Sequence, residues 1–140
     1  MIWEVCEEIQ LPKMSKTHGE LSGMKLTEII TLLDAEVLVG GDHVNKQITA
    51  CGAANLMEDL SRKRTKGSLL ITGLTSDLVI KTSIENQTGT VLMVRGKKPH
   101  PNMLALAEAS HLPVVLTQHA MFTASGILYM AGLRELDDSW

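Results

Sequence analysis

Two loops near the middle of the chain carry residue types that bind phosphate groups. The first contains Thr72, Gly73, Thr75 and Ser76 and follows a short apolar run. Glycine permits a tight turn, and the free N–H groups at the start of a following helix suit an anion. The hydroxyl residues could equally be ordinary helix caps and the glycine an ordinary turn residue. This loop is therefore a candidate anion site with a purely structural alternative.

The second loop, Arg95-Gly96-Lys97-Lys98, brings three cations together after another apolar run. Arginine can hold a phosphate through paired hydrogen bonds, and lysine adds a point charge. The same charges could instead serve only to keep a surface loop solvated. Thr117 follows a third apolar run. The residues that we predict to contact a ligand are Thr72, Gly73, Thr75, Ser76, Arg95, Gly96, Lys97 and Thr117.

The segment 67–99 must position both loops. Leu69–Thr72 and Val91–Val94 are apolar runs, and a helix-like pattern from Ser76 to about Asn86 separates them. Strand, helix and strand in about 30 residues form the βαβ pattern, whose strands run parallel with a right-handed crossover. Both strands are too apolar to face water, so helices should cover both faces of the sheet. The two loops then open on one edge, where open α/β sheets bind ligands.

The remaining pattern predicts an α/β fold, a three-layer α/β/α sandwich with a mixed, mostly parallel sheet of about five strands. Leu26, Ile29 and Leu33 share a helical stripe, with Thr27 as the expected N-cap. Further strands are expected at 35–39, 47–53 and 114–116, and further helices at about 55–62, 101–111 and from Thr117 or Gln118 to about 131. The short loop between 35–39 and 47–53 suggests an antiparallel pair.

Four strand ends are expected to converge on the ligand edge. They are Cys51–Asn55, Thr72–Ser76, Arg95–Lys98 and Thr117–His119. Phe122, the only phenylalanine, comes just after the last of them, and we expect it to pack in the core or at a dimer contact.

The chain divides into one domain and two flanking segments. Residues 24–133 form the expected domain, with Met24 as its functional start. Residues 1–23 read as an N-terminal extension, and whether it is ordered stays open; residues 134–140 read as a charged tail.

Composition narrows the class of protein. The 140 residues have a formal charge of -3 and only 3% aromatic side chains, which argues against a nucleic-acid binder. There is no apolar run long enough to span a membrane, so no membrane partner is expected. The two cysteines, Cys6 and Cys51, lie far apart and form no disulfide framework. A cytoplasmic protein is the expectation.

The residue types and their spacing give little support for a catalytic function. Cys51 has no activating neighbour in the sequence, and packing is the commoner role of such a thiol. The five histidines lack paired-ligand spacing, so no metal is expected. Neither a P-loop nor a dinucleotide-binding glycine motif is present, and no cofactor is predicted. An enzyme that uses Cys51, Thr72 or Thr75 is the weakest of the hypotheses.

The pieces in order resemble the DRTGG domain family. The resemblance rests on MKLTEIITLLDAEVLVGG, SLLITGL, VLMVRGKKP and LPVVLTQHAMFTASGIL, which span about 110 residues in this order. Where the family tends to have Gly-Asp-Arg after a strand, this chain has Thr72-Gly73-Leu74-Thr75. Where the family tends to have a glycine pair, this chain has Arg95-Gly96-Lys97.

The resemblance implies a fold like that of the N-terminal domain of HPr kinase/phosphorylase and a regulatory role. Family members occur between CBS domains in an inorganic pyrophosphatase, where the regulatory region binds adenine nucleotides, and within a phosphotransacetylase. Dimerisation is common in such settings.

Residues and resemblance together predict a regulatory domain that does not catalyse. It would bind a small anionic ligand, an adenine nucleotide or phosphorylated metabolite, and act through a homodimer on a partner enzyme. The alternative is a protein-interaction or dimerisation module without a small ligand.

Overall fold

Five strands build the central sheet of the computed structural model, which describes residues 23–55 and 66–135. Their order is β2 (Glu36–Val39), β7 (Val114–Leu116), β6 (Thr90–Met93), β5 (Leu69–Thr72) and β4 (Cys51–Ala53). The strands β4, β5, β6 and β7 run parallel, whereas β2 is antiparallel to β7. The predicted mixed, mostly parallel sheet is confirmed.

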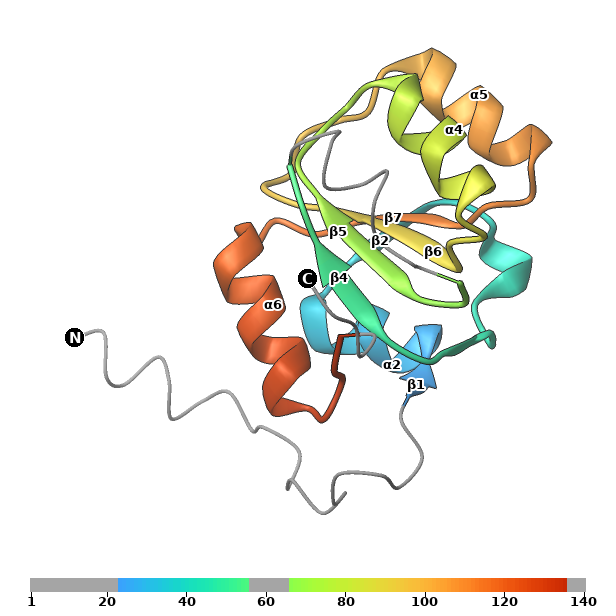
Figure 1. Ribbon diagram of the computed structural model, residues 1–140. Coiled ribbons are helices and arrows are strands. Elements are labelled where there is room, and N and C mark those ends of the chain that lie inside the picture. The colour runs from blue at the N-terminus through green and yellow to red at the C-terminus, as the bar shows by residue number, and fades with distance from the viewer. Residues whose placement is uncertain (1–22, 56–65, 136–140) are drawn as a thin grey trace.

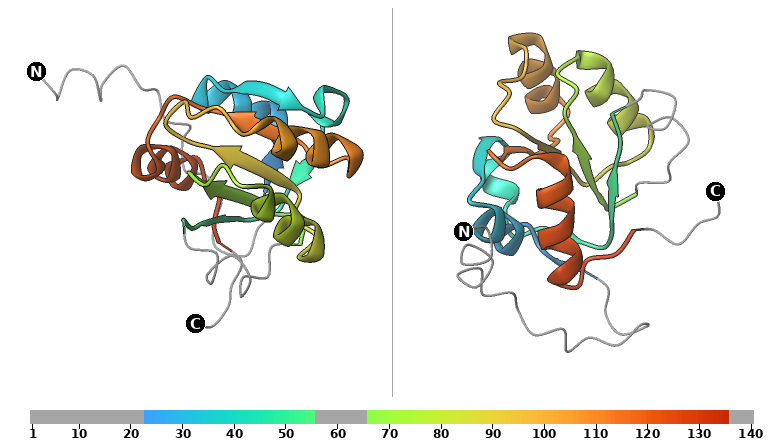
Figure 2. Two further views of the ribbon diagram at one scale, coloured as in Figure 1. Left: turned by 90° about the horizontal axis from the view of Figure 1, so that it is seen from above. Right: turned by 90° about the vertical axis from the view of Figure 1, so that its left-hand side faces the viewer.

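Helices cover both faces of this sheet (Figure 1). Helices α4 (Asp77–Glu85) and α5 (Pro101–Ala109) lie on one face, and α2 (Leu26–Leu33) and α6 (Met121–Met130) lie on the other (Figures 1 and 2). Residues 56–62 of the predicted helix and residues 1–22 of the predicted extension 1–23 lie outside the described residues, as does most of the tail.

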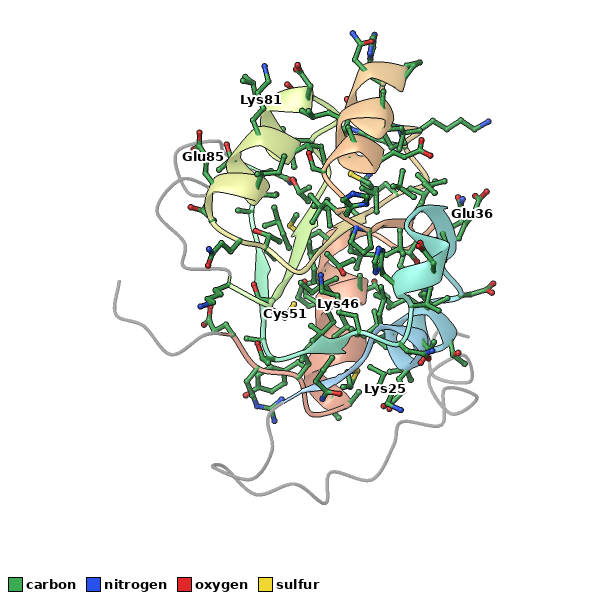
Figure 3. All side chains as sticks on the ribbon, turned by 90° about the vertical axis from the view of Figure 1, so that its right-hand side faces the viewer. Lys25, Glu36, Lys46, Cys51, Lys81 and Glu85 are labelled. Carbon is green, nitrogen blue, oxygen red and sulfur yellow. The ribbon has the colours of Figure 1, made fainter. Side chains whose placement is uncertain are left out.

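Both faces of the sheet are apolar, which explains why its strands read as continuous hydrophobic runs. Leu69 and Ile71 pack with α2 and α6, whereas Leu70, between them, packs with α4 and α5. Alternate side chains of a strand point to opposite faces, so each run supplies two cores. The charged side chains of α4, such as Lys81 and Glu85, project away from the sheet (Figure 3).

The expected antiparallel pairing of 35–39 with 47–53 is wrong. β2 forms one edge of the sheet and β4 the other. The predicted strand 47–53 is also two strands, because β3 (Gln47–Ile48) pairs with β1 (Met24–Lys25) in a separate two-stranded sheet. Between β2 and β3 the chain makes the short 3-10 helix η1 (Gly41–His43) and is then held by α2, whose first N–H groups donate to the carbonyls of Val44 and Lys46. These bonds draw the chain away from β2.

Three helix ends are occupied by residue types that suit such positions. Ser76 caps α4 by accepting from the Leu78 N–H at 3.2 Å, and Pro101 occupies the first turn of α5. Gly132 follows α6 at φ +105°, where the N–H of Leu133 donates to the Leu128 carbonyl, as in a Schellman motif. The prediction of Thr27 as the N-cap of α2 is wrong, because Thr27 lies inside this helix and Lys25 is at the N-cap position.

The left-handed position of Gly40 provides a test of the junction between β2 and η1. Its φ is +84°, and an added Cβ would lie 2.9 Å from the Pro113 Cα. A side chain in the left-handed region costs roughly 1–2 kcal/mol, before the contact is counted. We expect Gly40→Ala to lower the melting temperature by at least about 4 °C. Gly41→Ala is the control, since no atom lies within 4 Å of its added Cβ; equal melting temperatures for the two variants would contradict this account.

Candidate functional site

The carboxyl ends of the four parallel strands lie along one edge, as the sequence predicts. Hydrogen bonds join each loop there to its neighbour. The N–H of Val94 donates to the Thr72 carbonyl at 3.2 Å, which links the ends of β6 and β5. The N–H of Ala54 donates to the Ile71 carbonyl at 3.0 Å, which links the ends of β4 and β5. The four predicted loops therefore form one continuous edge.

The chain leaves β6 and β7 toward opposite faces of the sheet. The loop after β6 leads to α5 on one face, and the loop after β7 leads to α6 on the other (Figure 1). Neighbouring loops that leave in opposite directions can form a crevice between them, and ligands of open α/β sheets bind outside the carboxyl ends of the strands. Here the two loops are joined directly: the N–H groups of Arg95 and Gly96 donate to the carbonyls of His119 and Thr117, at 2.8 and 2.9 Å.

The loop Arg95-Gly96-Lys97-Lys98, which we call the basic turn, is a tight turn whose cationic side chains are exposed. Arg95 and Gly96 have φ values of +63° and +62°, and the Lys97 N–H donates to the Val94 carbonyl at 3.4 Å. Positive φ at both central positions is typical of a type I′ turn. Arg95 and Lys97 are exposed, and so is Lys98. The N–H groups of residues 95–97 all donate within the protein, so an anion at this loop would meet side chains rather than backbone.

Gly96 is favoured by its backbone conformation, and a side chain there would also meet the end of the Gln118 side chain. An added Cβ would come within 2.8 Å of the Gln118 Cδ. Gln118 belongs to the loop after β7 and thus packs directly against the turn. The glycine lets the two loops approach each other, which is a structural role in addition to the predicted contact with a ligand.

The Thr72–Ser76 loop is held from inside the protein. Thr72 is buried, and its Oγ1 accepts from the Leu74 N–H at 3.2 Å. The N–H of Gly73 donates to the Asn55 Oδ1 at 2.8 Å. Asn55 is therefore a residue that shapes this edge.

Unpaired donors remain at the start of α4, but so does an acidic group. Among the described residues, the N–H groups of Thr75, Ser76 and Asp77 have no hydrogen-bond partner. The Asp77 carboxylate lies in the first turn, 3.5 Å from the Lys81 Nζ. A carboxylate at this position already complements the helix dipole and opposes a second anion. Asp77 was visible in the sequence as a charge next to the predicted cap.

The start of α6 differs from the start of α4 because its first turn carries no acidic side chain. Its N-cap is Ala120, which has no capping side chain, and its first turn contains no acidic residue. The first turn of α6 therefore places no carboxylate of its own at the positive end of the helix dipole. The sequence contained the signal, since no Asp or Glu occurs between Thr117 and Leu133.

Thr117 and Cys51 have structural surroundings. The buried Thr117 hydroxyl donates to the Leu33 carbonyl at 2.8 Å and accepts from the His119 N–H at 3.3 Å. It thus fastens the end of α2 to the edge. Cys51 is partly buried on β4, and its N–H donates to the Arg134 carbonyl.

Residues 23–55 and 66–135 contain no group of three His, Cys, Asp or Glu side chains suited to a metal ion. None of the helices in these residues is long and apolar enough to cross a membrane.

Removing the Thr117 hydroxyl should destabilise the protein. Valine has the same shape, but Thr117→Val leaves the Leu33 carbonyl without this donor and the His119 N–H without its acceptor. A buried polar group that loses its partner costs about 1–3 kcal/mol. We expect this loss in the free energy of unfolding, measured by urea denaturation. Thr123→Val, at an exposed site on α6, is the isosteric control; a Thr117→Val variant as stable as this control would show that the two bonds contribute nothing.

The fold has a counterpart of known structure. The crystal structure of the CBS and DRTGG domains of the regulatory region of Clostridium perfringens pyrophosphatase, complexed with the activator diadenosine tetraphosphate, matches with a TM-score of 0.68 and 20% sequence identity. The match covers 90% of this chain and 56% of that chain, so this chain spans little more than half the length of its neighbour.

A comparison with the curated proteins finds no match. The model of the DRTGG domain family matches residues 28–131. This range is most of the chain, it runs from α2 through α6, and it confirms the resemblance seen in the sequence. The chain belongs to the DRTGG domain family.

Proposed function

We propose that this domain is a non-catalytic regulatory module that binds an adenine nucleotide at the carboxyl edge of its sheet. The observation that carries the proposal is the convergence of four loops on that edge, with the exposed Arg95 and Lys97 beside the uncapped start of α6. Two flexible cations and a positive helix end suit the phosphates of a nucleotide.

The local electrostatics favour one half of the edge. Phosphate groups would meet the side chains of Arg95 and Lys97 and the first N–H groups of α6. Gly96 would shape this contact, and Thr117 would hold its base without touching the ligand. Thr72, Gly73, Thr75 and Ser76 would border the site, with Asp77 limiting how closely a phosphate approaches α4.

The family and the structural neighbour support a regulatory role. The neighbouring structure is a regulatory region bound to a diadenosine activator, within a pyrophosphatase. By analogy, this domain would sense a nucleotide in the cytoplasm as a homodimer and pass the signal to a partner enzyme. Nothing in this scheme requires a cofactor or a metal ion.

A second candidate function is a protein-interaction module without a small ligand. One observation favours it: the N–H groups of Arg95, Gly96 and Lys97 are all engaged by protein carbonyls. Glycine-rich turns would then serve the fold alone, and the basic side chains would only solvate the loop.

The two functions are separated by the response of stability to ligands. A ligand that binds only the folded state at about one hundred times its dissociation constant adds about 2.7 kcal/mol. We expect ATP, ADP or a diadenosine polyphosphate to raise the melting temperature in a saturable way, and inorganic phosphate to do so less. A flat response to all of them would favour the interaction module.

Arg95→Gly tests the placement of the phosphates without straining the fold. Glycine adopts the observed φ of +63° freely, so the turn should persist. Loss of charge-assisted hydrogen bonds of about 1.5–3 kcal/mol should weaken nucleotide binding roughly 10- to 150-fold, measured by calorimetry. Lys25→Gln removes an exposed cation from β1, outside the four loops, and is the charge-matched control. Equal affinities for the two variants would exclude Arg95 from the site.

A further inference from the structure

Gln118 places a carboxamide group against the basic turn at the carboxyl edge. The residue is exposed and belongs to the loop between β7 and α6. Its Cδ and Nε2 atoms would each lie 2.8 Å from a Cβ added at Gly96, so the carboxamide fills the space that a side chain there would take. Among the described residues, no hydrogen bond engages this carboxamide. Its oxygen and its NH₂ group are therefore available to a molecule outside the chain.

The backbone on both sides of Gln118 is fixed by hydrogen bonds. Before it, the Thr117 carbonyl accepts from the Gly96 N–H at 2.9 Å. After it, the His119 N–H donates to the Thr117 hydroxyl at 3.3 Å, and the His119 carbonyl accepts from the Arg95 N–H at 2.8 Å. A side chain on a backbone that is already ordered loses less freedom when it binds a ligand. Gln118 is thus a preorganised polar contact at the edge.

A carboxamide has the hydrogen-bonding groups that the edge of a nucleobase requires. It offers an acceptor and two donor hydrogens, whereas the side chains of Arg95 and Lys97 only donate. Adenine presents a donor beside an acceptor, the N6 amino group next to N7, and glutamine forms a paired contact with these two groups. Phosphate oxygens only accept, and they suit the two cations. The two kinds of side chain at the basic turn therefore match the two ends of a nucleotide.

We propose that Gln118 recognises the base of the nucleotide through a paired contact of its carboxamide with N6 and N7 of adenine. The inference rests on the proposed function, because it needs the phosphates at Arg95 and Lys97. Since the carboxamide lies against Gly96, the base and the phosphates would meet neighbouring parts of the same turn. Gly96 then has a further role, which is to leave room for the carboxamide.

Calorimetric titration of the full chain with ATP, GTP and inorganic tripolyphosphate tests the proposal. Gln118→Met keeps the length of the side chain but removes its donors and its acceptor. It should weaken ATP binding about 5- to 150-fold, the range for one paired base contact, and leave tripolyphosphate binding unchanged. Gln47→Met replaces an exposed glutamine on β3, outside the four loops, and should bind ATP like the wild type.

Gln118→Glu tests the pairing itself. A carboxylate only accepts, so it opposes N7 of adenine and suits the N1–H and N2 amino donors of guanine. The added negative charge weakens the binding of every phosphate ligand, but this effect cancels in the ratio of two affinities. The affinity for GTP relative to ATP should rise at least about 10-fold over the wild-type ratio.

The outcomes separate this inference from the proposed function. The inference is overturned, while nucleotide binding stands, if Gln118→Met binds ATP like the wild type or if Gln118→Glu leaves the ratio unchanged. Equal weakening of ATP and tripolyphosphate by Gln118→Met also overturns it, because the residue would then act on the phosphates. A wild type that binds no nucleotide overturns both. Arg95→Gly should weaken ATP and tripolyphosphate alike, which distinguishes the phosphate contact from the base contact.

Discussion

The parallel pairing of β4, β5, β6 and β7 is the constraint on which the rest of the molecule depends. Because these strands are apolar on both faces, the sheet must be covered on both sides, and the connecting helices supply the cover. Parallel strands also end at the same edge. The loops at residues 72–76, 95–98 and 117–119 therefore meet whatever their sequences are. These loops lie together at the edge because the strands that precede them are paired side by side.

The edge is rigid at its base and open at its surface. Backbone donors of the basic turn are used to join neighbouring loops, and the Thr117 hydroxyl ties the edge to the end of α2. What remains for a ligand is a set of cationic side chains and one helix start without a carboxylate. Gly96 and Thr117, both predicted to contact a ligand, also hold this edge together through their hydrogen bonds, and their contact with a ligand stays a prediction. The loop after β7, to which this turn is hydrogen-bonded, leads into α6.

Local sequence patterns predicted the sheet and its carboxyl edge. Strand pairings and hydrogen bonds between residues far apart in the chain could not be predicted. The runs at Leu69–Thr72 and Val91–Val94 were sufficient to predict a βαβ unit, because apolar length and glycine boundaries are local properties. The partner of β2 was not readable, since β7 lies far along the chain and the short loop after β2 suggested β3 instead. The bonds from Gly73 to Asn55 and from Thr117 to Leu33 span 18 and 84 residues and have no sequence signature. Phe122, expected in the core or at a dimer contact, is almost fully exposed, because Ala124, Ile127 and Leu128 already fill the inner face of α6.

The central claim is that a nucleotide binds at the carboxyl edge of the sheet, and mapping of backbone amide signals by NMR during an ATP titration tests it most directly. The account predicts saturable shifts at Arg95–Lys97 and in the first turn of α6, Met121–Thr123, with smaller shifts at Thr75–Asp77. The amides of β1 and β3, outside the four loops, should not move. Shifts confined to β1 and β3, or none at millimolar ATP, would contradict the assignment of this edge as the ligand site.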